Sequence, residues 1–345
     1  MPLFYKNMKR FFAFLIGTVM LMSTLWSCST PIDGNSVAFS SDNFEISRGE
    51  MAYFFVKTMR STLAAYSKAE LEEIGYTAGK PLREQNFKGG KSFYELFLAS
   101  TEKYVKELLI LCESAKQAGV GIDESDALER KLAEFKAECE KAYGVAFEKY
   151  IDTYFYGCVS EKDFCRAVEL EMLANKFLKL KTEEIYAGIT PERIDQYIND
   201  SKIEENGEKT KTLMTLFVSS KKHTDAAARA EELLNGFSPS REGFAALAKE
   251  HSDNEEFLFE NCQKGDLASE LDAWLFDSER KVGDVEILKV SGGALIAYYC
   301  EEGLSVSDLF ASRALAESDY ARWLDCQSEL FPIITNKEVL NSLDI

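Results

Sequence analysis

The chain has 345 residues, of which 46% are hydrophobic and 28% charged, and its formal net charge is −18. This length is enough for two domains with a sizeable core. The acidic balance argues against nucleic acid as a partner, because an acidic surface repels a phosphate backbone.

The first 28 residues have the pattern of an export signal. Three basic residues between positions 6 and 10 precede Phe11 to Leu21, an uncharged and mostly apolar run of eleven residues. This run is too short to span a bilayer, which needs about 20 apolar residues. Leu25-Trp26-Ser27-Cys28 then resembles the end of a bacterial lipoprotein signal. The resemblance implies a signal peptide over residues 1–27 and a lipid on Cys28. The alternatives are an uncleaved anchor or an ordinary signal peptide with an unrelated cysteine.

Cleavage at that point would place the mature chain on the extracytoplasmic face of a membrane, held by its lipid anchor. Residues 1–27 carry three basic and no acidic side chains, so their removal takes the formal charge from −18 to about −21. Residues 28–42 are small and polar and predict a flexible tether.

Residues 43–205 are expected to be nearly all helical. A short strand is expected over Asn43–Ile46, and capping-box patterns at Ser47–Glu50 and Ser92–Glu95 predict two helix starts. Spaced apolar residues predict one helix over 51–74, a long one that ends near Gly119, and several more. These begin at residues 123, 145, 160 and 190. We interpret the many aromatic residues here mainly as core, although some could line a groove for unfolded chains.

The pattern changes near residue 208, where a compact α+β domain is expected over 208–302. A strand is predicted over 209–219, followed by helices over 224–234 and 241–251 and by a loop to about residue 267. Two strands, 285–290 and 294–300, flank Ser291-Gly292-Gly293, which is a hairpin signal.

Residues 303–345 return to a helical pattern as far as about Ser328. Phe331 to Thr335 could form an edge strand, where Pro332 is tolerated. We expect this segment to pack back on the helical domain, so that the small domain is inserted in it.

Several segments resemble a known family. Phe44 to Glu50 and Tyr143 to Tyr150 resemble the helical N-terminal domain of SurA-type chaperones. Four further segments resemble a parvulin-type peptidyl-prolyl isomerase: residues 226–234, 244–253, 265–267 and 281–285. Together with the signal, they are similar to PrsA-like lipoprotein foldases. The resemblance implies an α+β fold in which a mostly helical SurA-N-like chaperone domain carries an inserted parvulin-like domain. The implied partners are unfolded or nascent secreted polypeptides.

The chain departs from parvulins at the residues that the family uses for catalysis. Thr215 stands where the resemblance implies a histidine in the first strand, and Leu295 where it implies a second one in the last strand. Asn254 takes the place of a cysteine or aspartate. The segment before Phe276 is several residues shorter than in active members, and Phe276 is what remains of the expected wall of the proline pocket.

These substitutions predict little or no catalysis. Isomerisation has to cross a barrier of about 18–20 kcal/mol set by amide resonance, so a catalyst must bind the twisted amide better than the planar one. Leu295 has no donor or acceptor, and a Thr215 hydroxyl does not reproduce an imidazole. We therefore expect a chaperone without catalytic residues. Two alternatives stay open: an active isomerase with a rearranged site, and a structural or solute-binding lipoprotein.

Other chemistry has little support in the sequence. Only two histidines, His223 and His251, are present, and there is no CxxC pair or nucleotide-binding, zinc-protease or serine-hydrolase motif. We expect no cofactor and no metal. The eight cysteines are irregularly spaced and predict mostly buried free thiols. Whether the neighbours Cys158 and Cys165 ever oxidise stays open.

Overall fold

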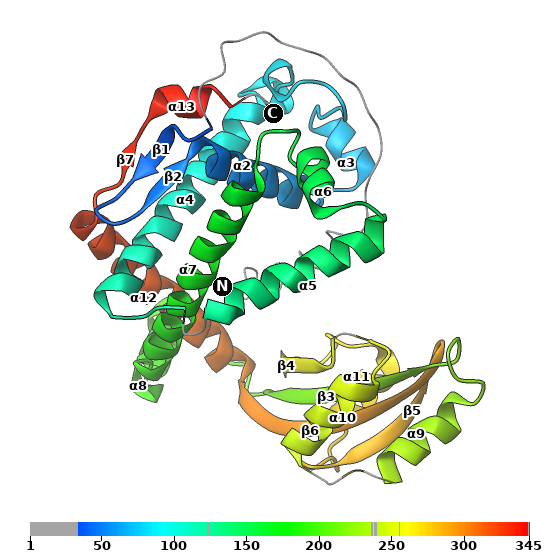
Figure 1. Cartoon of the computed structure of the whole chain (residues 1–345). Helices are drawn as coiled ribbons and strands as arrows, with labels where there is room; N and C mark the ends of the chain where they lie inside the picture. Colours follow the sequence, from blue (N-terminus) through cyan, green and yellow to red (C-terminus); the bar gives the residue numbers. More distant parts are fainter. Residues whose placement is uncertain (1–33, 123–124, 236, 238–239, 255, 344) are drawn as a thin grey trace. The chain divides into compact units, whose positions relative to one another are not determined.

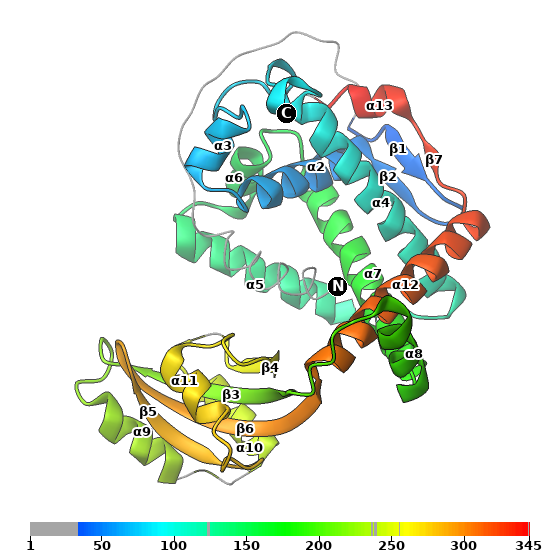
Figure 2. The same cartoon turned by 180° about the vertical axis from the view of Figure 1, so that it is seen from behind.

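The computed structural model describes residues 34–122, 125–235, 237, 240–254, 256–343 and 345. The predicted signal peptide and Cys28 lie outside this range. The chain divides into two compact units (Figures 1 and 2). Unit 1 combines the residues up to 187 with residues 317–345, and unit 2 comprises residues 188–316. Unit 2 is thus an insertion in the chain of unit 1. The predicted α+β class is confirmed, because helices dominate and two small antiparallel sheets accompany them.

Unit 1 is mostly helical. Its elements before the insertion are β1 (Val37–Ser40), β2 (Glu45–Ser47), α2 (Arg48–Leu63), α3 (Lys68–Glu73), the 3₁₀ helices η1 (Leu82–Glu84) and η2 (Phe87–Gly89), α4 (Phe93–Gln117), α5 (Ser125–Tyr143), α6 (Phe147–Tyr154) and α7 (Glu161–Ala187). After the insertion, the end of α12 (Val306–Leu330) leads to β7 (Ile334–Thr335) and α13 (Lys337–Asn341).

The three strands of unit 1 form an antiparallel sheet with the order β2-β1-β7. Phe39 of β1 lies opposite Ile46 of β2 on one side and opposite Thr335 of β7 on the other. The tether predicted over residues 28–42 is therefore wrong for residues 37–40. Ala38 and Phe39 are fully buried, and burial of these apolar side chains favours a paired strand over a solvated tether.

Helices α2 and α4 start at the two predicted capping boxes. Ser47 and Ser92 each accept from the backbone N–H three residues later, and Glu50 and Glu95 reciprocate. The single helix predicted over 51–74 is wrong, because α2 ends at Leu63 and α3 begins after a further capping box at Ser67. This local cap supplies an oxygen for a free N–H group, which stabilises a new helix start.

Aromatic side chains from α2, α4, α6 and α7 fill the core of unit 1. Phe54 and Phe55 are fully buried, and Phe55 lies against Tyr94 and Phe97 of α4. Tyr53 contacts Phe155 and Phe164. Their packing agrees with the interpretation of these aromatic residues as core.

Unit 2 is built around a four-stranded antiparallel sheet. Its elements are α8 (Pro191–Ser201), β3 (Lys209–Ser219), α9 (Ala226–Asn235), α10 (Arg241–His251), β4 (Leu258–Cys262), α11 (Ser269–Leu275), β5 (Val285–Val290) and β6 (Gly293–Ser305), followed by the start of α12. The strand order is β4-β3-β6-β5. The loop predicted from the end of α10 to residue 267 is wrong, because it contains β4.

Each face of this sheet has its own core, because successive side chains of a strand point to opposite faces. Helices α9 and α10 cover one face, where Phe244 packs with Leu216 and Ile296. Helix α11 covers the other face, where Leu275 packs with Leu213. The second face is called the α11 face hereafter.

Gly293 allows the close approach of β6 and β3. A Cβ atom here would overlap the carbonyl oxygen of Val218 and lie 3.1 Å from the ring of Phe217. We expect Gly293→Ala to lower the free energy of unfolding of unit 2 by about 1–3 kcal/mol, the usual cost of overpacking. Urea unfolding would measure this as a lower midpoint. Gly207→Ala, which has open space around the glycine, is the matched control. Equal midpoints for the two variants would contradict the prediction.

None of the seven described cysteines forms a disulfide. Four are buried as predicted, whereas Cys158 and Cys165 are half-buried and Cys326 is exposed. No helix within the described ranges is long and apolar enough to cross a membrane.

Candidate functional site

The α11 face holds three of the four positions at which the resemblance to parvulins implies other residues. Thr215 lies in β3, and its neighbours Leu213 and Phe217 both belong to the core of this face. Leu295 of β6 belongs to the same core, and Phe276, the residue that follows α11, packs against it.

Thr215 and Leu295 are close neighbours on this face. Thr215 lies opposite Ala297 in the pairing of β3 with β6, and Leu295 is two residues from Ala297 on the same strand. Such diagonal positions lie about 7–8 Å apart. Thr215 is 3% exposed and Leu295 is 8% exposed, so the pair lies inside a packed core.

Phe276 lies beside a lysine that the sequence analysis did not identify. The Lys211 amino group is 5.4 Å from the centre of the Phe276 ring and 5.0 Å from that of Tyr299. It also donates to the carbonyl oxygen of Leu275 at 2.9 Å. Lys211 therefore ties β3 to the C-terminal end of α11, where a cation is favoured by the helix dipole.

Asn254, the fourth position, is exposed. Its backbone N–H donates to the hydroxyl of Ser252 at 3.2 Å. The preceding Asp253 binds the backbone of β3 near its C-terminal end. Its carboxylate accepts from the N–H of Ser219 at 2.7 Å, and its own N–H donates to the carbonyl oxygen of Phe217. Residues 252–254 thus fasten α10 to β3.

The two histidines lie near acidic side chains. His223 Nε2 is 3.8 Å from a carboxylate oxygen of Asp253, and His251 Nε2 is 3.6 Å from Glu250. His223 follows the end of β3 and His251 is the last residue of α10.

Helix α11 is fixed on the sheet by a polar cluster that sequence reasoning missed. The indole N–H of Trp274 donates to Glu286 of β5 at 3.0 Å. Arg280 lies over the Trp274 ring, with 4.7 Å to its centre, and pairs with Glu286 at 3.1 Å. Trp274 is only 5% exposed. The spacing of Trp274, Arg280 and Glu286 gives no local signal, because the loop between α11 and β5 brings them together.

The chemistry available on the α11 face is limited. Burial raises the pKa of Tyr299 to about 12, so its hydroxyl stays protonated near neutral pH. Lys211 is held by a carbonyl oxygen and two rings, and Glu286 by Trp274 and Arg280. The described groups therefore stabilise the packing of α11, and none of them is a base or an imidazole beside Thr215 or Leu295.

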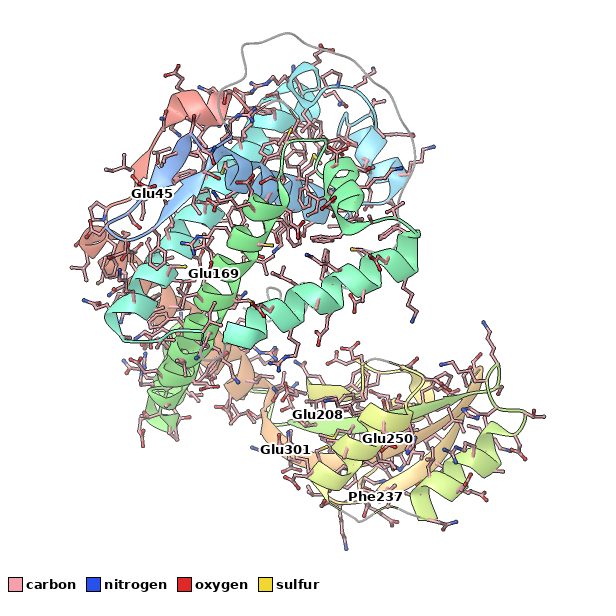
Figure 3. All side chains as sticks on the ribbon, in the orientation of Figure 1. Glu45, Glu169, Glu208, Phe237, Glu250 and Glu301 are labelled. Carbon is pink, nitrogen blue, oxygen red and sulfur yellow. The ribbon has the colours of Figure 1, made fainter. Side chains whose placement is uncertain are left out.

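A hollow of about 700 Å³ lies in unit 1 between the β1–β2 hairpin and α7. Figure 3 labels two of its acidic residues, Glu45 on β2 and Glu169 on α7. Lys162 and Arg166 add positive charge, and Phe44 is the one aromatic residue among the described lining residues. This mixed, polar lining differs from the aromatic-lined cleft that the sequence suggested.

Glu113 of α4 holds the turn of the same hairpin. Its carboxylate accepts from the Ser41 hydroxyl at 2.6 Å, the Asn43 backbone N–H at 2.7 Å and the Asn43 side-chain amide at 2.7 Å. Burial would raise the pKa of Glu113, but these hydrogen bonds outweigh it and hold the pKa below the ordinary value of 4.5. The carboxylate therefore acts as a structural anion that positions the edge of the hollow.

Within the described part of the chain, no group of three or more potential metal ligands lies close together. The comparisons with known proteins give structural neighbours only. No protein-family model and no curated protein matches the chain.

The chain is similar to several solved structures at low identity. PrsA from Bacillus subtilis is 18% identical, with 75% of this chain and 91% of that chain covered and a TM-score of 0.36. The foldase protein PrsA from Streptococcus pneumoniae is 15% identical, with 72% and 92% covered and a TM-score of 0.28. A SurA-like chaperone from Campylobacter jejuni is 10% identical, with 88% and 99% covered and a TM-score of 0.27. The neighbours are thus PrsA-like and SurA-like proteins, but at these scores no site or activity is transferred from them.

Proposed function

We propose that the chain is an extracytoplasmic, lipid-anchored chaperone that holds unfolded secreted polypeptides without ATP, and that its parvulin-like unit is not a working isomerase. The anchor is proposed from Cys28 and the export signal before it. Client binding would depend on burial of exposed apolar side chains of the unfolded chain.

One observation carries the proposal. Unit 2 has the strand, two helices and final hairpin expected from the sequence, and Thr215 and Leu295, which stand where the resemblance implies two histidines, are buried neighbours. A site for a twisting amide needs polar groups around the carbonyl and an apolar pocket open to a proline ring. Here the corresponding face is packed by α11, which supports a binding or spacing role for unit 2.

Two assays on the purified chain in mild detergent test this function. Light scattering of a chemically denatured client should show suppressed aggregation when the chain is added at an equimolar amount. A protease-coupled assay with a proline peptide should show no acceleration above the uncatalysed rate. Absence of protection for every denatured client would contradict the chaperone role. A rate enhancement that Phe276→Ala abolishes would instead establish an isomerase.

A further inference from the structure

Three tyrosine rings of unit 1 form a row that ends on an arginine, and a fourth tyrosine lies against the same arginine. Tyr143 ends α5, Tyr150 and Tyr154 lie one turn apart on α6, and Tyr156 follows α6. The ring centres of Tyr143 and Tyr150 are 5.2 Å apart, and those of Tyr150 and Tyr154 are 5.3 Å apart. The guanidinium carbon of Arg60, in the last turn of α2, is 3.9 Å from the centre of Tyr154 and 5.5 Å from that of Tyr156. Figures 1 and 2 both show this end of α2 beside α6. These five residues are named the tyrosine–arginine site.

Arg60 has no carboxylate partner among the residues whose side chains the structure describes. Its Nη2 donates to the carbonyl oxygen of Tyr154 at 3.1 Å and to the hydroxyl of Tyr156 at 3.3 Å. Its Nε is buried without an acceptor. Lys57, three residues earlier on α2, is paired with Glu171. In a chain with 58 acidic residues, the Nε and Nη1 groups of Arg60 thus have no acceptor among the described residues, and an N–H group of a guanidinium forms a strong hydrogen bond with a carboxylate oxygen.

A second donor of the site is also unpartnered. Tyr150 is 4% exposed, and its hydroxyl is buried without a hydrogen-bond partner. Burial raises the pKa of Tyr150 well above its ordinary value of 10.0, so the hydroxyl keeps its proton and remains a donor. A buried donor without an acceptor is destabilising, and a ligand oxygen that reaches it removes that cost.

Tyr156 forms the open side of the site. It is 55% exposed, and its φ of +56° places it in the left-handed region, which aromatic residues rarely adopt. The turn is fixed by the N–H of Gly157, which donates to the carbonyl oxygen of Asp152 at 2.8 Å. Strained backbone of this kind concentrates at functional sites. The turn presents the Tyr156 ring to solvent next to the guanidinium.

We infer that the tyrosine–arginine site binds the side-chain carboxylate of an aspartate or glutamate in an extended client polypeptide, with an adjacent aromatic residue of the client on the ring of Tyr156. This inference rests on the proposed chaperone function and specifies its clients. The local charge favours this occupant, because Arg60 is a cation that no carboxylate of the described residues neutralises. The exposed ring of Tyr156 supplies apolar contact area, and the donors without a described acceptor supply the preference for an acid.

The test uses two fluorescent peptides with blocked ends that differ in one residue. Each contains a single tryptophan in a glycine–serine background, followed by aspartate in one peptide and by asparagine in the other. Anisotropy titrations with the purified chain in mild detergent should show at least about tenfold tighter binding of the aspartate peptide. Equal affinity for the two peptides would overturn the inference. So would binding restricted to a third peptide, which has a free terminal carboxylate and no acidic side chain.

Variants place the preference on Arg60. Arg60→Gln should abolish the preference for aspartate, and Arg60→Lys should lose most of it, because lysine keeps the charge but not the planar fork. Thermal unfolding of each variant verifies that it is folded. If Arg60→Gln does not fold, the test is made with Arg60→Lys. The control is Arg322→Gln, which makes the same charge change at a side chain that is 72% exposed. A preference that survives in both Arg60 variants, or that Arg322→Gln removes equally, would refute the site. If the chain did not suppress aggregation but still preferred the aspartate peptide, the result would count against the proposed function and not against the site.

Discussion

Replacing Trp274 by alanine is expected to destabilise unit 2 by about 3–5 kcal/mol, the usual cost of deleting a large buried aromatic side chain. The ring packs in the core of the α11 face, donates to Glu286 and lies under Arg280. Its loss would leave a cavity and free two charged groups from their anchor. Hydrogen exchange should measure the effect as faster exchange of β3, β5 and β6 amides.

Two matched variants sharpen this prediction. Trp274→Phe keeps most of the ring contact but removes the indole N–H, so we expect a smaller loss of about 1–2 kcal/mol. Trp323→Ala removes a half-buried tryptophan from unit 1 and should leave exchange in unit 2 unchanged. If the amides of the sheet exchanged as slowly in Trp274→Ala as in the natural chain, α11 would not cover the sheet as described.

Removal of the Glu113 side chain is expected to destabilise unit 1 by about 2–4 kcal/mol in Glu113→Ala. Each hydrogen bond to a charged group contributes about 1.5–3 kcal/mol, and the three bonds share one carboxylate, so their contributions do not simply add. Urea unfolding at neutral pH measures the loss. Glu102→Ala, which removes a partly exposed glutamate of the same helix, is the control and should cost far less.

The contribution of Glu113 should also depend on pH. Its pKa is held below 4.5 in the folded chain, so the unfolded chain takes up a proton first as the pH falls. The stabilisation is therefore complete well above pH 4.5 and is lost as the pH falls through the lower folded pKa. The difference in unfolding free energy between the natural chain and Glu113→Gln should shrink over this range. A difference that stays constant from pH 7 to about pH 3 would contradict the assigned role of the carboxylate.

Sequence reasoning predicted elements well where the signal is local. The starts of α2 and α4 were found from Ser47 and Ser92, because a capping box needs only four consecutive residues. Strand β4 was missed because it is short and contains Glu260 and Asn261, which are poor strand formers. Asn261 has a φ of +53°. Pairing with β3 stabilises β4 although its residues have a low strand propensity.

The candidate site was predictable only in part for the same reason. The resemblance identified Thr215 and Leu295, but not that α11 packs over their face. Nothing near Lys211 in the sequence indicates that it would reach Leu275, which is 64 residues away. The tyrosine–arginine site likewise combines residues of α2 with residues of α5 and α6, so no window of the sequence contains it.

Strand β7 has a consequence for biosynthesis. One edge of β1 is paired by β2 within the first 47 residues, whereas the other waits for Ile334 and Thr335. Unit 2 lies wholly between these points and contains all its own strands, so it can fold before unit 1 is complete. A premature stop would therefore leave an intact insert on an open sheet edge, a state prone to edge-to-edge association. Completion of unit 1 thus depends on the segment that follows unit 2 in the chain.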